Sequence, residues 1–122
     1  MAARAGETFP RRSRLTRATE FQQVFKNNFR CADALVTILV GRVEGEWPRL
    51  GFAIARKQVP RATRRNRLKR LFRESFRKAQ HRLPARDLVI MVRRDIDRAA
   101  PQEIRAALDK HWNSIIKQCV KS

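Results

Sequence analysis

Apolar residues recur along this chain with helical spacing in three segments. Phe21, Val24 and Phe25 lie three and four positions apart, which predicts a short helix that begins near a capping Thr16 or Thr19. Residues 61–82 predict a long helix with an inward stripe at Leu68, Leu71, Phe72, Ser75, Phe76 and Ala79. A closing helix is expected from Pro101, with its stripe at Ile104, Ala107, Leu108, His111 and Ile115.

Three other segments predict strands: residues 35–43, 49–56 and 87–94. The first is rich in Val, Ile and Leu, and the third contains an unbroken apolar run over residues 88–92, which indicates a strand buried on both faces. The order α, β, β, α, β, α indicates an α+β fold with helices against one small sheet. The first apolar stretch is long enough to conceal a further short strand.

The strand at residues 49–56 has one bulky face and one nearly bare face. Leu50, Phe52 and Ile54 point one way, while small residues alternate with them. The bulky face is expected to pack in the core. The bare face would leave a shallow trough for a neighbouring helix, which strand patterning favours, or for an extended ligand.

Length and composition indicate one small domain of 122 residues that is 43% hydrophobic. We expect a basic, flexible arm over residues 1–15, a single domain over residues 16–118 and a short tail over residues 119–122. The chain has 29 Lys and Arg against 11 Asp and Glu, a net charge of +18, and this excess of positive charge predicts nucleic acid as the partner.

Other classes of protein fit the sequence less well. Apolar runs are too short for a membrane span or a signal peptide. Cys31 and Cys119 lie far apart with no metal-ligand spacing, so a reducing cytoplasm fits best. The acid pair Asp95 and Asp97 is expected in a solvated loop, and His81 completes no nuclease-like set. We therefore expect no catalytic residue, no protein-bound metal or other cofactor and no small-molecule substrate.

Residues 56–82 form the electrostatic centre of the chain, with twelve Lys or Arg and one acid, Glu74. At about 100° per residue, one polar arc of the predicted helix contains Asn66, Lys69, Arg70, Arg73 and Arg77, with Arg65 and Arg67 at the two margins of the apolar stripe. Like charges one turn apart repel, whereas a merely solvated helix face usually mixes the two signs of charge. Planar guanidinium groups suit phosphate oxygens, and this arc predicts contact with a phosphate backbone.

The stretch from Arg56 to Phe76, with Arg65-Asn66-Arg67 at its core, resembles the signature of the bacterial ribonuclease P protein subunit. The segments at residues 20–25 and 49–55 are similar to the helix and strand that precede that signature in the family. The resemblance runs in collinear order from Arg14 to Trp112.

The resemblance implies the order α-β-β-β-α-β-α with about four strands, three helices and a left-handed βαβ crossover, the class called ribosomal-protein-S5-domain-2-like. It also implies a function. In the family, a catalytic RNA with bound Mg²⁺ removes the 5′ leader of precursor transfer RNA, and the protein assists.

By the same resemblance, contacts to the catalytic RNA map onto Arg56, Lys57, Arg61, Arg65, Asn66, Arg67, Lys69, Arg70 and Arg73. The leader of the precursor maps onto Phe21 and Phe25 and the sheet face they border. As ordinary core remains an alternative for both rings, we weight Phe25 toward the core and leave Phe21 open. Residues 35–39 carry no aromatic side chain, where some family members have one.

Two other functions stay open at this point. A structural RNA-binding protein of the ribosomal type would be equally small and basic. A DNA-binding regulator that uses residues 64–78 as a recognition helix fits least, because no helix-turn-helix pattern precedes that segment.

Overall fold

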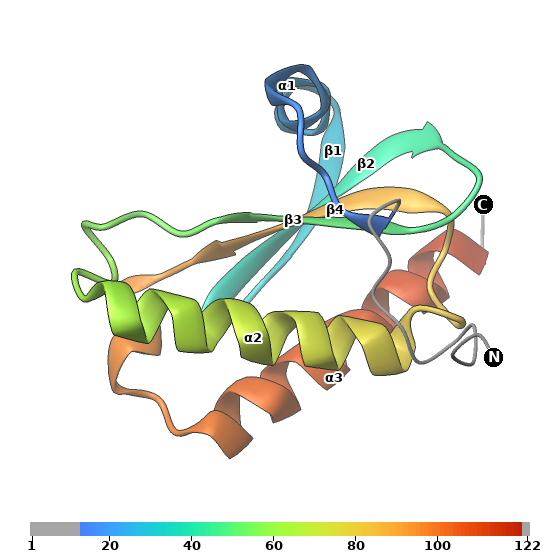
Figure 1. Cartoon of the computed structure of the whole chain (residues 1–122). Helices are drawn as coiled ribbons and strands as arrows, with labels where there is room; N and C mark the ends of the chain where they lie inside the picture. Colours follow the sequence, from blue (N-terminus) through green and yellow to red (C-terminus); the bar gives the residue numbers. More distant parts are fainter. Residues whose placement is uncertain (1–12, 121–122) are drawn as a thin grey trace, which may run out of the picture.

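The computed structural model describes residues 13–120 and shows a four-stranded sheet with helices on both faces (Figure 1). In chain order the elements are α1 (Ala18–Lys26), β1 (Asn28–Ala32), β2 (Val36–Glu44), β3 (Arg49–Ala53), α2 (Ala62–Ala79), β4 (Arg86–Val92), the 3-10 helix η3 (Arg94–Arg98) and α3 (Pro101–Val120). Helix α1 lies on one face of the sheet, while α2 and α3 cover the other. The α+β class and the order implied by the resemblance are confirmed.

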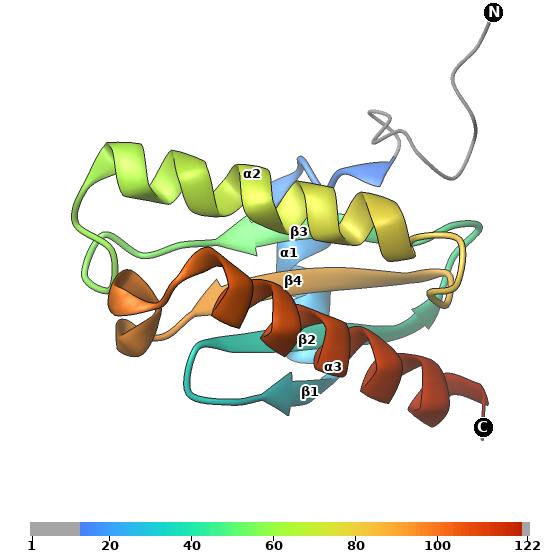
Figure 2. The same cartoon turned by 90° about the horizontal axis from the view of Figure 1, so that it is seen from below.

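The strands lie in the order β1-β2-β4-β3, and β3 pairs with β4 in parallel while the other pairs are antiparallel. Figure 2 views the sheet from the side of α2 and α3. There β3 and β4 both run from right to left, and the chain passes in front of the sheet through α2 before it enters β4 below β3. This course is left-handed, as the resemblance implied and against the general preference for right-handed crossovers.

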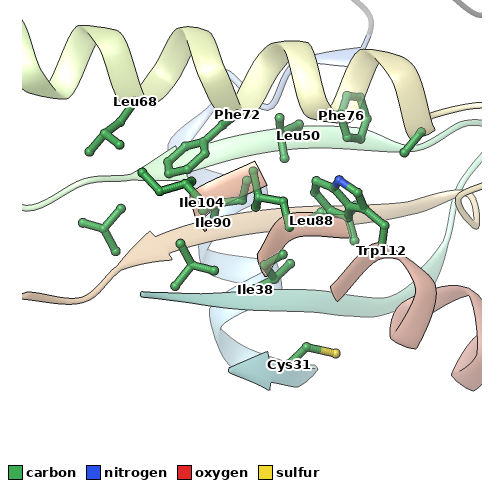
Figure 3. Close-up of a cluster of buried hydrophobic side chains, with 14 of the residues drawn as sticks. Cys31, Ile38, Leu50, Leu68, Phe72, Phe76, Leu88, Ile90, Ile104 and Trp112 are labelled. Atoms are coloured by element: carbon green, nitrogen blue, oxygen red, sulfur yellow. The ribbon is translucent and has the colours of Figure 1, made fainter. Parts of the chain in front are cut away.

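The main core lies between the sheet and the two helices α2 and α3 (Figure 3). Leu50, Leu88 and Ile90 project from the strands toward Phe72 of α2 and Trp112 of α3. All five are at most 1% exposed. The indole Nε1 of Trp112 donates a hydrogen bond of 2.8 Å to the Ser75 hydroxyl, so the polar atom of the ring is satisfied inside the core.

Strand β1 is the element that hydrophobic patterning missed. Its sequence alternates polar and apolar residues over only its first four positions, and Cys31 and Phe29 face the core while Arg30 is exposed. Pairing with β2 forms the strand, because five residues of β1 each lie opposite a residue of β2. A further strand therefore exists, but it precedes the apolar stretch of residues 35–43, which forms the single strand β2, and tertiary pairing rather than local propensity creates it.

Three local expectations differ from the structure. Helix α1 begins without a threonine cap, because the Glu20 carboxylate instead accepts hydrogen bonds from the backbone N–H groups of Thr16 and Arg17 at 3.2 and 3.1 Å. Strand β3 ends at Ala53, although Ile54 still packs on the core. Asp95 and Asp97 lie in the 3-10 helix η3 rather than in a loop.

The predicted domain boundaries shift at both ends. Ser13 and Leu15 are buried, and the Leu15 N–H donates to the Leu50 carbonyl at 3.0 Å, so these residues belong to the folded domain rather than to an arm. Residues 1–12 of the predicted arm lie outside the described residues. At the other end, α3 continues to Val120, two residues into the predicted tail.

Candidate nucleic-acid interface

Helix α2 separates apolar from cationic side chains because its apolar residues recur at helical spacing. Leu68, Phe72, Phe76 and Ala79 are buried against the sheet and α3. Most of the predicted cations are exposed on the other side. Together with the uncharged Asn66, these cations are called the cationic helix face, which comprises Arg61, Arg65, Asn66, Arg67, Lys69, Arg70 and Arg73. Glu74 is the one acid in the helix sequence, so little negative charge offsets the face locally.

Arg56 and Lys57 are exposed in the turn that leads from β3 to α2. The N–H groups of Gln58 and Val59 both donate to the Ala55 carbonyl at 3.1 Å, and Val59 is fully buried. These contacts fix the turn on the core. Arg56 and Lys57 are therefore presented next to the start of the cationic helix face.

Arg65 holds this turn against the helix. Its Nη1 donates to the carbonyls of Val59 and Pro60 at 2.9 and 2.8 Å. Arg65 is half-buried and bonded to two backbone carbonyls, so it positions the turn. The neighbouring Asn66 and Arg67 are exposed. The three residues of the Arg-Asn-Arg core thus differ in their surroundings.

Arg64 has a structural role that sequence reasoning missed. Its Nη2 donates to the carbonyls of Ile96 and Ala99 at 3.0 and 2.9 Å, and its Nε lies 3.8 Å from the Asp97 carboxylate. These contacts join α2 to η3. The acids of η3 were the available signal, because carboxylates in a basic chain tend to lie beside a cation.

Two further arginines extend the cationic surface to the end of β4. Arg93 and Arg94 line a cleft of about 510 Å³ together with Lys57 and Gln58 of the turn, and Asp95 is the acid in its lining. Strand order brings them together, because β4 lies beside β3 and both end at the same edge of the sheet. Their sequence neighbourhood alone gave no signal of this grouping.

The face of the sheet that carries α1 is partly filled. A Cβ atom built at Gly51 would lie 2.6 Å from Cζ of Phe21 and 3.0 Å from Cβ of Leu15, so these two side chains cover the bare position of β3. Val24, Leu39 and Val89 complete a small second core there. The neighbouring-helix interpretation of the trough is thus confirmed at Gly51.

Beyond α1 the same face stays open along one row that crosses all four strands. Ala32, Thr37, Met91 and Ala53 lie opposite one another in register, and each is at least partly exposed. Phe25 of α1 is 46% exposed, which contradicts the weighting of this ring toward the core. Phe21 is half-buried.

An ion network anchors α1 to the sheet. Arg49 of β3 forms two hydrogen bonds of 2.8 Å with the Asp87 carboxylate and one of 2.6 Å with Oε2 of Glu20. Burial alone would raise the pKa of Glu20, but the backbone N–H groups of Arg17 and Thr16, and then Arg49, outweigh it and hold that pKa below its usual value. The network orients the helix that carries Phe21 and Phe25.

Among the described residues, no group of three or more His, Cys, Asp or Glu side chains lies close enough to hold a metal ion. No helix within that part of the chain is long and apolar enough to cross a membrane. The exposed chemistry of the described surface is instead cationic, with one partly open apolar sheet face.

A sequence model of the family Ribonuclease P matches residues 9–116 of this chain. The chain belongs to that family. Ribonuclease P protein components are 41% identical over 114 residues in Haemophilus influenzae (strain PittGG), covering 93% of this chain and 96% of the relative, and 39% identical over 115 residues in Pseudoalteromonas atlantica, covering 94% and 96%.

Solved ribonuclease P proteins share the fold. The protein from Thermotoga maritima is 29% identical, with a TM-score of 0.73 over 84% of this chain and 96% of that chain. The protein from Staphylococcus aureus, 22% identical, gives a TM-score of 0.75 over 81% and 91% and supports the fold alone. The resemblance at the Arg-Asn-Arg core is therefore confirmed as family membership over nearly the whole chain.

Membership in the Ribonuclease P family makes this chain a protein component of a ribonuclease that acts in transfer RNA processing. A ribonuclease P protein works as part of a ribonucleoprotein, so ribonuclease P RNA is its partner. The regulator and ribosomal alternatives lose their basis. Which residues meet the RNA is a separate question that the geometry above addresses.

Proposed function

We propose that the cationic helix face, with Arg56 and Lys57, binds ribonuclease P RNA. The observation that carries this proposal is the division of α2, whose apolar side is buried while Arg67, Arg70, Arg73 and Lys78 are exposed and one acid, Glu74, lies among them. A helix that folded for stability alone would mix charges on its outer side, because like charges one turn apart are unfavourable. Phosphates of an RNA backbone remove that repulsion.

The contribution of the protein is electrostatic. Cations at one-turn spacing neutralise phosphates and release counterions, so affinity for the RNA should fall steeply with salt. By screening the repulsion between the catalytic RNA and its substrate, they also reduce the Mg²⁺ concentration that the RNA requires. Hydrolysis of the phosphodiester bond belongs to the RNA with its bound Mg²⁺, and the protein supplies neither catalytic residue nor cofactor of its own.

The 5′ leader of precursor transfer RNA would lie on the open row of the sheet beside α1. Rings beside such a face can stack single-stranded bases without sequence preference, at about 1 to 3 kcal/mol per base. Phe25 is the more available ring because it is 46% exposed, while Phe21 also packs on Gly51. Substrate and partner are thus both RNA, with no small-molecule substrate and no membrane, and the complex would work in the cytoplasm.

The first test is cleavage of labelled precursor transfer RNA at low Mg²⁺ with protein alone, cognate ribonuclease P RNA alone, and both together. We expect cleavage with both components and little with either alone. Accurate cleavage by the protein alone would refute an RNA-based reaction. Unchanged cleavage on addition of protein would refute the assisting role.

The second test locates the RNA contact. Arg67→Ala removes an exposed cation of the cationic helix face, while Lys117→Ala removes an exposed cation of α3 as a matched loss of charge. We expect weaker assembly and a salt slope reduced by about 0.7 to 0.9 for Arg67→Ala. Equal effects of the two variants would place the RNA elsewhere. Arg65→Ala is a poorer probe because Arg65 also holds the turn before α2.

A further inference from the structure

A second, smaller cleft lies at the free edge of β3, apart from the open sheet face. Strand β3 is last in the order β1-β2-β4-β3, so one of its edges has no neighbouring strand of the sheet. The segment before α1 meets that edge through an isolated parallel bridge between Arg14 and Leu50. Past this bridge, a cleft of about 270 Å³ remains between the segment, β3 and α2, and we call it the edge cleft.

The edge cleft is separated from the outer sheet face by packed side chains. Leu15 and Phe21 close over Gly51 at contact distance, as the built Cβ atom at Gly51 shows. Leu15 and Phe21 therefore pack against the second core on one side and line the edge cleft on the other. A ligand in the edge cleft would not occupy the row of Thr37 and Met91.

The lining combines cations with flat apolar surface. Arg14, Lys69 and Arg73 supply positive charge, Phe21 and Phe52 supply rings, and none of the lining residues is acidic. The Arg73 guanidinium carbon lies 5.3 Å from the centre of the Phe52 ring, and that ring lies 5.9 Å from the ring of Phe72 in the core. The planar guanidinium group of Arg73 is thus held over the Phe52 ring, which itself packs on the core. It therefore offers a fixed flat surface as well as a positive charge.

The backbone adds polar groups at the same place. Successive residues of a strand direct their N–H and C=O groups to opposite edges. Because the Leu50 carbonyl accepts the Leu15 N–H on the outer edge, the N–H and C=O of Phe52 are directed to that same edge. They lie where the edge cleft begins and can bond the rim of a planar ligand.

We propose that the edge cleft binds one unpaired nucleotide of an RNA strand, with the base stacked on the Arg73–Phe52 pair and phosphate held by Arg14 and Lys69. A nucleotide joins a flat π surface to an anion within one residue length, which matches this lining. An acidic peptide would contact the cations but would not stack on the aromatic rings. The volume suits one base-sized group rather than a duplex.

This inference rests on the proposed function, since it takes RNA as the partner. It differs in content, because it assigns Arg73 to a base rather than to phosphate alone and adds Phe52, Arg14 and the edge of β3 as contacts. It predicts that part of the binding energy depends on the base and survives at salt concentrations that remove phosphate contacts.

The probes are adenosine 5′-monophosphate, ribose 5-phosphate and a hexaglutamate peptide, each titrated into the full chain and followed by NMR of the backbone amides. We expect the monophosphate to shift the amides of residues 50–52 and 69–73. It should bind about five- to a hundredfold more tightly than ribose 5-phosphate, the stacking contribution converted at tenfold per 1.4 kcal/mol. Equal affinities, or shifts confined to α1 and the outer sheet face, would overturn the proposal.

Two variants separate stacking from charge. Arg73→Lys keeps the positive charge and removes the planar guanidinium group. Arg70→Lys makes the same change at an exposed position of α2 outside the edge cleft. We expect Arg73→Lys alone to remove the preference for the monophosphate over ribose 5-phosphate. If both variants act alike, Arg73 contributes charge only and the proposal fails. Hexaglutamate that binds the edge cleft as tightly as the monophosphate would instead indicate a protein partner.

The low-Mg²⁺ cleavage assay distinguishes a failure of the edge-cleft proposal from a failure of the proposed function. A chain that enhances cleavage but does not prefer the monophosphate refutes the edge cleft and leaves the proposed function intact. A chain that fails to enhance cleavage refutes the proposed function, whatever the probes show. Arg73→Lys should also fold as the parent does, because the side chain is exposed, and its amide spectrum checks this directly.

Discussion

Replacing Gly51 with alanine tests the contact between α1 and the sheet most directly. The added methyl group would lie 2.6 and 2.7 Å from Cζ and Cε1 of Phe21 and 3.0 Å from Cβ of Leu15. The ring can turn away, but Leu15 is tied by its backbone to Leu50. Overpacking of this kind costs about 1 to 3 kcal/mol, and the lower entropy of an unfolded alanine returns about 0.5 to 1. We expect a net loss of about 1 to 2 kcal/mol.

The assay is urea unfolding followed by tryptophan fluorescence, to which the buried Trp112 contributes. Gly45→Ala is the matched control, because a Cβ atom there meets its nearest neighbour, the Ala85 carbonyl oxygen, at an ordinary 3.7 Å. That variant should be neutral or slightly stabilising. A Gly51→Ala chain as stable as the Gly45→Ala chain would show that Phe21 does not rest on β3.

A double-mutant cycle identifies the ring as the source of the effect. Phe21→Ala alone should destabilise the chain by about 1 to 3 kcal/mol, less than a fully buried ring because Phe21 is half-exposed. With the ring absent, the methyl group of Gly51→Ala fills part of the space it left. The double variant should therefore be more stable than the sum of the single effects by about 1 kcal/mol. Additive losses would contradict the contact.

Three further outcomes are expected. Ser75→Ala leaves the buried Trp112 indole N–H without its acceptor and should lower the free energy of unfolding by about 1 to 3 kcal/mol in urea titrations; an unchanged midpoint would argue against that hydrogen bond. Asp33, in the turn between β1 and β2, accepts hydrogen bonds from the backbone N–H groups of Leu35 and Val36 at 2.8 and 3.0 Å. Burial would raise the pKa values of Glu20 and Asp33, but their hydrogen bonds from backbone N–H groups outweigh it and lower these pKa values below the ordinary 4.5 and 3.8. Their stabilisation is thus complete above those values and lost as pH falls through the lowered pKa values, which thermal melts between pH 2 and 6 would show as a falling midpoint. Burial raises the pKa of the Cys31 thiol, so alkylation at pH 8 should be slower in the native chain than in urea, as mass spectrometry would measure; equal rates would show that Cys31 is accessible.

Local pattern was sufficient where a segment buries one face along its whole length. The stripe of α2 shows this, since Leu68, Phe72 and Phe76 recur at helical spacing and are all buried. The same spacing places the cations on the outer side without any tertiary information. Pattern failed for β1, because its four alternating residues are too few to distinguish a strand from a loop, and only pairing with β2 settles it.

The sequence by itself determined the class of the fold, the amphipathic α2, the cationic charge and, through the Arg-Asn-Arg core, the family. These features depend on residue type and spacing, which a linear chain displays in full. Only the tertiary structure decided that Arg65 and Arg64 bind backbone carbonyls while Arg67 faces outward, and that Arg73 lies over Phe52. Neighbouring arginines are chemically alike, so what each one does depends on the carbonyls, carboxylates and rings that folding brings within its reach.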